Sequence, residues 1–272
     1  LPDHTDPATV LALAQMTKNS YLNAAVDDGA QQNGGDTGWL DIPGWNLTDR
    51  FGWDSDGIRG YVFTDLEDDV MVIALKGTSL ATPLVGGGVT SPRDKLMDNL
   101  MFSCCCGKAG WSWTPVCDCA QGAARDKQCN VTCLHDATNT GGSYYNLAQT
   151  IFLAVKADYP HRYAIWMAGH SLGGALASLT ALTHDVPAFT FEAPGDLLYA
   201  QRLALLPRLP PPSPTDPHPN YDAFLARVPI YHFGNTRDPI FLGECVGATS
   251  SCWYAGYALE SKCHAGKECL YD

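Results

Sequence analysis

The sequence has no apolar run that approaches the roughly 18 residues needed to cross a bilayer. Residues 1–14 also lack the basic start of a signal peptide, so any signal or anchor is expected upstream of this chain. Positive charge is scarce, with 17 Lys and Arg against 29 Asp and Glu and a net charge of -12. That balance argues against nucleic acid as a partner, and no basic patch favours anionic lipid at neutral pH. The sequence shows no internal repeat.

Cysteine, by contrast, is abundant, and seven of the 11 cysteines fall between Cys104 and Cys133. In a chain of 272 residues this density predicts disulfides and an oxidising compartment. The sequons at Asn46 and Asn130 are predicted glycosylation sites and agree with a secretory route. Because the count is odd, one thiol is expected to lack a partner within the chain.

The spacing of some of these cysteines also allows a metal site. The pairs Cys117-x-Cys119 and Cys129-x3-Cys133 could hold zinc. Oxidised secretory chains rarely use cysteines in that way, so structural disulfides are the favoured interpretation and no metal is expected.

Helical and strand patterns alternate along the chain. An Asp6-Pro7 start followed by apolar residues three and four apart predicts the first helix. Two β-branched runs around an acidic turn at 66–69 predict a strand pair. Strand, helix, strand patterns follow from residue 142 to residue 240, which predicts an α/β fold with a mostly parallel central sheet and helices on both faces. We expect a single domain over 1–272, with a cysteine-rich insertion at about 103–142 and a proline-rich one at 207–219.

The clearest motif for chemistry is "GHSLG", which places Ser171 between a predicted buried strand and a predicted helix. A nucleophile elbow requires that setting, because its strained turn lifts the serine hydroxyl clear of the backbone. Gly169 and Gly173 then stand where a Cβ would collide with the neighbouring backbone. The helix amino terminus behind Ser171 favours negative charge, and the N–H of Leu172 is a natural first oxyanion donor. The alternative is a serine with only a turn or capping role.

A serine nucleophile needs a base and an orienting acid, which in this type of fold follow it in the order Asp or Glu, then His. His264, on a loop that Cys263 could tether by a disulfide, is favoured as the base over His232, which lies inside a predicted strand. The third histidine after the serine, His218, lies among prolines and is expected to be solvated. Asp238 follows a predicted strand and is the favoured acid, with Asp196 as the alternative.

Together, "VIALKGTS", "GHSLGGALASL", "TFEAPG" and "GNTRDPI" resemble the class 3 lipases, a fungal branch of the α/β-hydrolases. Longer stretches such as "DNLMFSCCCGKAGWSW" and "YALESKCHAGK" are similar to the vacuolar members of that family over nearly the whole chain. The proline-rich stretch is the part that the resemblance does not cover.

The resemblance implies a triad of Ser171, Asp238 and His264, and it implies Thr78 as the second oxyanion donor. It also implies a phospholipase that breaks down vesicle membranes delivered to the vacuole, with an N-terminal transmembrane anchor outside this chain. The chemistry needs neither metal nor cofactor. An acyltransferase of the same fold and a catalytically silent lipid-docking module are the alternatives.

Lipid access is expected to come from the segment at 77–102, where class 3 lipases carry a lid and "ATPLVGGGV" offers apolar residues on a flexible stem. An ordinary long loop explains the same segment equally well. Trp111 and Trp113 could anchor the protein at a membrane interface or form a small core in the insertion. Because a base must be neutral, the rate is expected to fall on the acid side despite a vacuolar setting.

Overall fold

The computed structural model describes residues 1–23, 38–53, 57–65, 70–78, 91–107, 113–122, 128–139, 142–161, 164–213 and 219–272. Its centre is a seven-stranded sheet in which the strands follow one another in chain order. The strands of this sheet are β1 (Trp45–Phe51), β2 (Gly60–Asp65), β3 (Val70–Leu75), β6 (Ala164–His170), β7 (Ala188–Phe191), β8 (Ile230–Asn235) and β9 (Lys267–Tyr271). The pairs from β3 to β9 are all parallel, whereas β1 and β2 are antiparallel to their neighbours.

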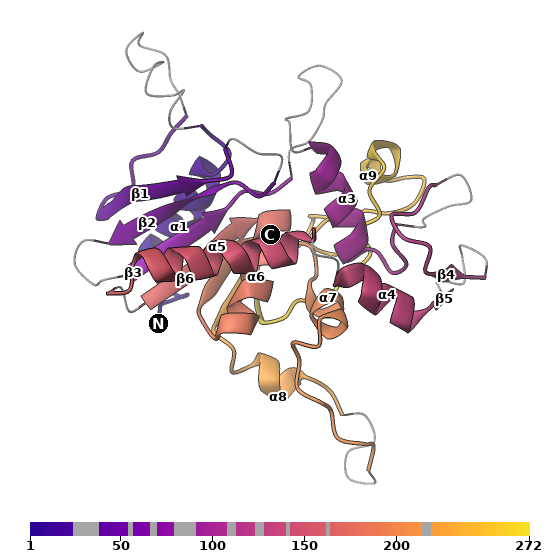
Figure 1. The fold of residues 1–272 in the computed structure, drawn as a ribbon. Coiled ribbons are helices and arrows are strands. Elements are labelled where there is room, and N and C mark those ends of the chain that lie inside the picture. Colours follow the sequence, from indigo (N-terminus) through magenta and orange to yellow (C-terminus); the bar gives the residue numbers. More distant parts are fainter. Residues whose placement is uncertain are drawn as a thin grey trace.

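Helices cover both faces of this sheet (Figure 1). On one face, α1 (Pro7–Asn19) packs through Leu13 and Met16. On the other, α5 (Tyr144–Asp158) and α6 (Leu172–His184) cross the strands. Because both faces are covered, every residue of β3 is buried. The predicted α/β architecture, mostly parallel and covered on both faces, is therefore confirmed.

The predicted elements fall where the sequence pattern put them. Asp6 caps α1, accepting hydrogen bonds from the N–H groups of Ala8 and Thr9, and Pro7 opens the helix. The strand pair around the acidic turn is β2 and β3, which are antiparallel. The sequence pattern did not predict β1, because its central residues are all exposed and, apart from Leu47, polar, so the strand has no buried face.

The cysteine-rich insertion packs at one end of the sheet. α3 (Ser91–Phe102) leads into it, and its own regular elements are the short pair β4 (Ala120–Gln121) and β5 (Gln128–Cys129), and α4 (Val131–Thr138). Three shorter helices complete the described chain: α7 (Leu197–Arg202), α8 (Asp222–Leu225) and α9 (Ser251–Ala255). Figure 1 shows α3 beside α9 at this end, and Trp113 of the insertion packs against Trp253 of α9 with ring centroids 5.0 Å apart.

Four disulfides hold the chain, and three of them lie within the insertion. They join Cys105 to Cys129, Cys106 to Cys117, Cys119 to Cys133, and Cys245 to Cys252. The prediction of structural disulfides is confirmed. Three cysteines rather than one remain as thiols, and Cys263 is among them, so the expected disulfide tether beside His264 is wrong.

Among the described helices, none is both long enough and apolar enough to cross a membrane. The segment 79–90, which contains most of the expected lid, lies outside the described residues, as do Trp111 and His218.

Candidate active site

Ser171 sits in a strained turn between β6 and α6. Its backbone has φ 54° and ψ -129°, a conformation that a non-glycine residue adopts only when its surroundings enforce it. The Ser171 N–H donates to the carbonyl of Phe191, 3.0 Å away at the end of β7, and its side chain makes no capping hydrogen bond. This geometry is that of a nucleophile elbow, with the hydroxyl at the carboxyl edge of the parallel strands.

Two glycines leave room for this turn. A Cβ on Gly169 would lie 2.2 Å from the carbonyl oxygen of Gly173, and a Cβ on Gly173 would lie 2.4 Å from that of Leu75. Real Cβ atoms do not approach backbone oxygens so closely, so neither position accepts a side chain without moving β6, α6 or β3. The expected reason for both glycines is therefore observed.

Two backbone groups flank Ser171 as candidate oxyanion donors. Leu172 opens α6, where an N–H has no acceptor within the helix. Thr78 follows β3 at the same edge, and its Oγ1 donates to Oδ2 of Asp98 at 2.6 Å. Asp98 lies on α3 and is buried, and this burial raises the pKa of its carboxyl to about 8. The hydrogen bond to this buried carboxyl, whose raised pKa favours the protonated form at neutral pH, therefore holds the Thr78 side chain in place.

Asp238 also lies at this edge, three residues beyond the end of β8. Its Oδ1 accepts the N–H of Ile240 at 2.8 Å, and its charge opposes the burial that lowers the pKa of His170. A second carboxyl faces it, that of Glu192, which follows β7 with a left-handed φ of 47°. Burial raises the pKa of Glu192, and Asp238 adds to that shift, while hydrogen bonds from Tyr271 and Asn235 oppose it.

The residue before the nucleophile is held by the end of the first helix. Tyr21 Oη and His170 Nδ1 share a hydrogen bond of 2.7 Å, and their rings meet edge to face. A Cβ placed on Gly77, just before Thr78, would lie 2.2 Å from Tyr21 Oη and 3.0 Å from Ser171 Cβ. Tyr21 therefore reaches the strand ends that carry both Thr78 and Ser171.

His264 has a different environment from these edge residues. The ring is 3% exposed, its Nδ1 bonds Oε1 of Glu268 at 3.1 Å, and its Nε2 bonds the Ala193 carbonyl at 3.0 Å. It also stacks on Phe241 with ring centroids 4.1 Å apart. Neither Ser171 nor Asp238 is among its hydrogen-bond partners in the described chain.

The strand register explains this separation. His264 lies against His232 of β8, with ring centroids 4.9 Å apart, and His232 is paired with Thr190 of β7. Thr190 in turn is level with Gly169, two residues before Ser171. Two residues along a strand span roughly 7 Å. The imidazole therefore packs beside β8 on the side of His232, and its Nε2 reaches the carbonyl of Ala193, two residues beyond the end of β7.

The alternative triad residues belong to the same network, which we call the His264 network: the buried residues His264, His232, Asp196 and Thr190, together with the exposed Glu268. Asp196 is fully buried, and its Oδ1 accepts the Ala265 N–H at 2.8 Å. His232 Nδ1 shares a 2.7 Å hydrogen bond with Thr190 Oγ1, in the packing role expected for it. Burial strongly lowers the pKa of His232, whereas the Glu268 hydrogen bond and Asp196 outweigh burial and raise the pKa of His264.

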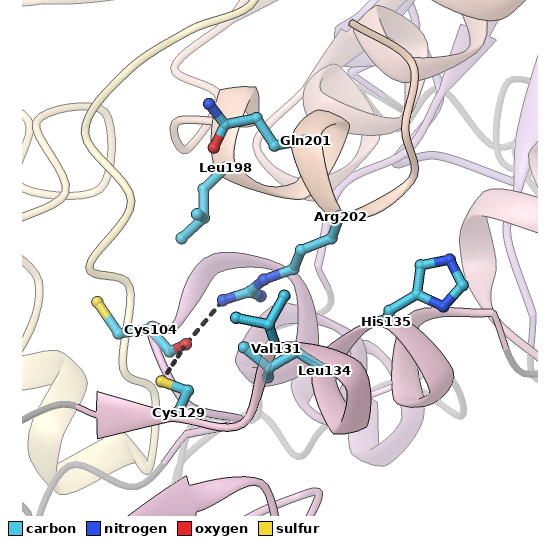
Figure 2. Close-up of a pocket in the computed structure, with 8 residues that line it drawn as sticks. All are labelled: Cys104, Cys129, Val131, Leu134, His135, Leu198, Gln201 and Arg202. Carbon is cyan, nitrogen blue, oxygen red and sulfur yellow. Dashed lines mark hydrogen bonds between the residues drawn. The ribbon is translucent and has the colours of Figure 1, made fainter. Parts of the chain in front are cut away.

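A cavity of about 510 Å³ lies away from the serine, between α4 and α7 (Figure 2). Its walls combine the apolar side chains Val131, Leu134 and Leu198 with the Arg202 guanidinium. That guanidinium is committed to the end of α3, donating to the carbonyls of Leu100, Ser103 and Cys104. No predicted catalytic residue lines this cavity.

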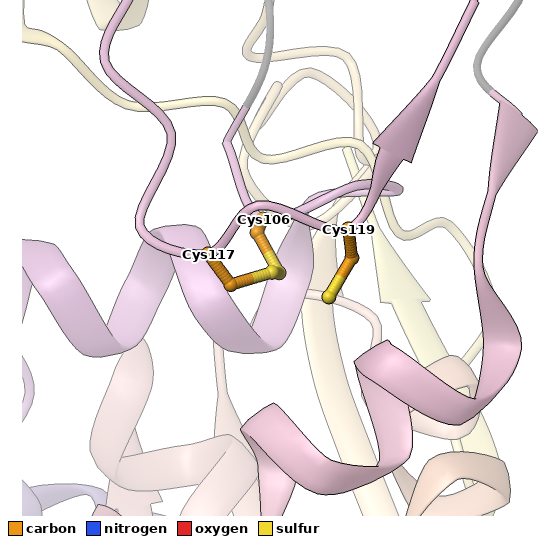
Figure 3. Close-up of side chains that lie close together, drawn as sticks. All are labelled: Cys106, Cys117 and Cys119. Carbon is orange, nitrogen blue, oxygen red and sulfur yellow. A yellow bond between two sulfur atoms is a disulfide. The ribbon is translucent and has the colours of Figure 1, made fainter.

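A cluster of sulfur atoms is the described group with the closest resemblance to a metal site. Cys106, Cys117 and Cys119 bring their sulfurs within 4.8 Å of one another (Figure 3). All three sulfurs are used in disulfides, since Cys106 joins Cys117 and Cys119 joins Cys133. A disulfide sulfur is no thiolate, so this group has no ligand to offer zinc.

Sequence reasoning missed three residues around Ser171, namely Tyr21, Asp98 and Glu192. Glu192 had a visible signal, because it directly follows the strand after the elbow helix, where a carboxyl reaches the sheet edge. Tyr21 and Asp98 had none, since Tyr21 follows α1 and Asp98 lies on α3, and the position of both helices against Ser171 depends on tertiary packing.

The sequence is similar to known lipases. Residues 109–186 match the family model described as "Lipase (class 3)". The whole chain is 46% identical over 271 residues to a protein of Mycosarcoma maydis named "Putative lipase ATG15", of which it covers 48%. It is 43% identical over 274 residues to a protein of the same name from Cryptococcus neoformans, again covering 48%. The chain thus spans about half the length of these relatives.

A solved structure is also similar. The Lip2 lipase from Yarrowia lipolytica matches 99% of this chain and 80% of its own, with 16% sequence identity and a TM-score of 0.47.

Proposed function

Since the chain belongs to the class 3 lipases, we propose that it is a serine hydrolase that cleaves acyl esters of membrane glycerophospholipids. The observation that carries the proposal is the strained backbone of Ser171 between β6 and α6. Such a turn costs folding free energy and persists because it exposes a nucleophile. Relatives named as lipases agree with ester hydrolysis as the reaction.

In the proposed reaction, the Ser171 hydroxyl attacks the ester carbonyl and forms a tetrahedral oxyanion. The N–H groups of Leu172 and Thr78 donate to that oxygen, each being worth about 3 kcal/mol if other oxyanion holes are a guide. The alcohol half leaves with a proton, and water then hydrolyses the acyl-enzyme to release a fatty acid.

Asp238 is proposed as the acid of the triad, because it lies at the same edge as Ser171 and acts on His170. His264 is proposed as the base on one condition. Its ring must leave Glu268 and the Ala193 carbonyl to reach Ser171, since both of its nitrogens are engaged in the His264 network. The assignment of the base therefore includes a movement of the segment around residue 264.

The proposed substrate is a vesicle membrane, and the proposed location is the vacuole, reached by the secretory route. The four disulfides support an oxidising route. Asn46 and Asn130 are both exposed, as glycosylation sites must be. The family resemblance supplies the vacuolar phospholipase role, and the name shared by the relatives carries the link to autophagy.

The test measures fatty-acid release from phosphatidylcholine liposomes between about pH 4 and pH 8 by this protein, by Ser171→Ala and by the exposed control Ser251→Ala. We expect Ser171→Ala to lose at least about 10⁴-fold in rate while Ser251→Ala retains full activity. Below neutral pH the rate should fall, because a histidine base must be neutral. Release that persists in Ser171→Ala would refute the proposal, and acyl transfer to an added alcohol would identify an acyltransferase.

A further inference from the structure

Tyr21 is anchored where α1 ends against the sheet. Ser20, beside it, donates from Oγ to the carbonyl of Ala74 in β3 at 3.2 Å. The Tyr21 ring is 37% exposed, and Nζ of Lys76 lies 5.3 Å from its centroid. The ring is therefore held between the end of α1 and the residue that follows β3.

The hydroxyl of Tyr21 meets two strand ends at once. It shares the 2.7 Å hydrogen bond with His170 Nδ1, and a Cβ on Gly77 would lie only 2.2 Å from it. His170 precedes Ser171, and Gly77 precedes Thr78. The same hydroxyl thus contacts the residue before the nucleophile and the residue before the second oxyanion donor.

We propose that Tyr21 is a positioning residue that sets the spacing between Ser171 and the Thr78 N–H. This inference rests on the proposed function of Ser171. The distance between nucleophile and oxyanion donor must hold within a fraction of an ångström, because oxyanion stabilisation depends on donors that are fixed in advance. Without the hydroxyl, the residues after β3 and the elbow after β6 lose a side-chain atom that contacts both.

The chemistry of the hydroxyl fits a bridging role. Desolvation raises the pKa of Tyr21 well above its usual value, and the Gly77 backbone only partly opposes that shift. The hydroxyl keeps its proton across the range in which a lipase works, so it can donate to His170 Nδ1. Burial lowers the pKa of His170, which favours the neutral ring that can accept this hydrogen bond.

The test compares Tyr21→Phe with a matched control, Tyr145→Phe. Tyr145 Oη also shares a single hydrogen bond, 2.8 Å from Thr183 Oγ1, but between α5 and α6 and away from the edge. Both changes remove one hydroxyl and keep the ring. The readouts are kcat and KM on soluble p-nitrophenyl butyrate, Tm, and the rate at which a fluorophosphonate labels Ser171.

We expect Tyr21→Phe to lower kcat and the labelling rate by about 10-fold to 100-fold with KM within about twofold. Tyr145→Phe should leave these rates unchanged, and both variants should have a similar Tm. Equal kcat values in the two variants, or a fall in the Tm of Tyr21→Phe with unchanged kcat, would overturn the positioning role. Ser171→Ala separates the two proposals, because turnover that survives it refutes the nucleophile and not merely Tyr21.

Discussion

The carboxyl edge around Ser171 and the His264 network beside β7 and β8 are held in place by different interactions. At the edge, backbone atoms decide the geometry: the φ of Ser171 and the close approach of Gly173 to Leu75. In the network, hydrogen bonds of titratable side chains determine the geometry: the imidazole of His264 bonds the Glu268 carboxylate and the backbone carbonyl of Ala193. Backbone geometry at the edge requires a particular residue type at each position, such as glycine, and this requirement is visible in the sequence. Side-chain pairing in the network uses His, Asp and Glu, which are common residues and do not reveal their partners in the sequence.

The largest expected effect comes from removing the proposed base. This substitution tests whether His264 moves from its network to Ser171 during catalysis. If His264 leaves its network to serve Ser171, His264→Ala should lower kcat on a soluble ester by about 10⁴-fold or more. Steady-state kinetics on the folded protein, verified by circular dichroism, measures the loss.

Glu268→Gln is the matched control for that experiment. It weakens the network at the 3.1 Å contact but keeps the imidazole, so the enzyme should retain activity within about tenfold. If His264→Ala instead folds, loses stability and still turns over ester, then His264 is only a structural residue and the base is a different group.

The elbow can be broken at Gly169. Gly169→Ala places a Cβ 2.2 Å from a backbone oxygen, and we expect a loss of about 3 kcal/mol in the free energy of unfolding. The displaced turn should also lower kcat by about 100-fold. Urea denaturation and ester hydrolysis measure the two effects.

Gly142→Ala controls for the loss of a glycine as such. Its nearest heavy atom would be Nη2 of Arg93, 4.0 Å from the new Cβ, so stability should stay within about 0.5 kcal/mol of the original protein. Equal losses in the two variants would contradict the close approach of β6 and α6.

The same contrast explains what the sequence could predict. The strand, the helix and the two glycines around Ser171 are local, so a short motif predicts them together with the position of the serine. Period and capping also predict α1, β2, β3, α5, α6, β7 and β8.

Specific contacts between side chains escaped prediction, whether the two residues are close or distant in sequence. The partner of His264 lies only four residues away, yet nothing in "KCHAGKE" distinguishes an ion pair with Glu268 from a loop histidine that is free to act as a base. Tyr21 reaches His170 across 149 residues, through packing that no sequence period encodes. An exposed polar strand such as β1 likewise has no buried face to reveal it.

Both regions contain a group whose titration couples folding to pH. Asp98 at the edge has a pKa raised to about 8 by burial, so it binds a proton when folded that the unfolded chain has released. The Glu268 hydrogen bond and Asp196 likewise raise the pKa of His264 in the fold above its usual value, despite its burial. Raising the pH from about 6.5 to 8 should therefore lower the free energy of unfolding, by up to about 1.4 kcal/mol per pH unit for each proton.

Asp98→Asn isolates the contribution of Asp98 to the pH dependence of stability, because the amide still accepts the hydrogen bond from Thr78 but cannot titrate. Chemical denaturation at pH 6.5 and pH 8 should give a smaller difference for this variant than for the original protein. An identical pH dependence would show that Asp98 is ionised in the fold. His232 is neutral in the fold and takes up a proton only in the unfolded chain, so its contribution is the same in both proteins and cancels in the comparison.

The smallest expected effect comes from making the same type of substitution, Thr to Val, once in each region. Thr78→Val removes the 2.6 Å hydrogen bond to Asp98, and Thr190→Val removes the 2.7 Å hydrogen bond to His232. Each loses a buried hydroxyl contact worth about 1 kcal/mol, so the two variants should have similar stability. Only Thr78→Val should also lower kcat, by about tenfold, because the Thr78 N–H is the proposed second oxyanion donor and the hydrogen bond to Asp98 would help to orient it. Equal kcat values would mean that Asp98 stabilises α3 without orienting the donor, and a larger loss in Thr190→Val would place the His264 network in the chemistry of the edge.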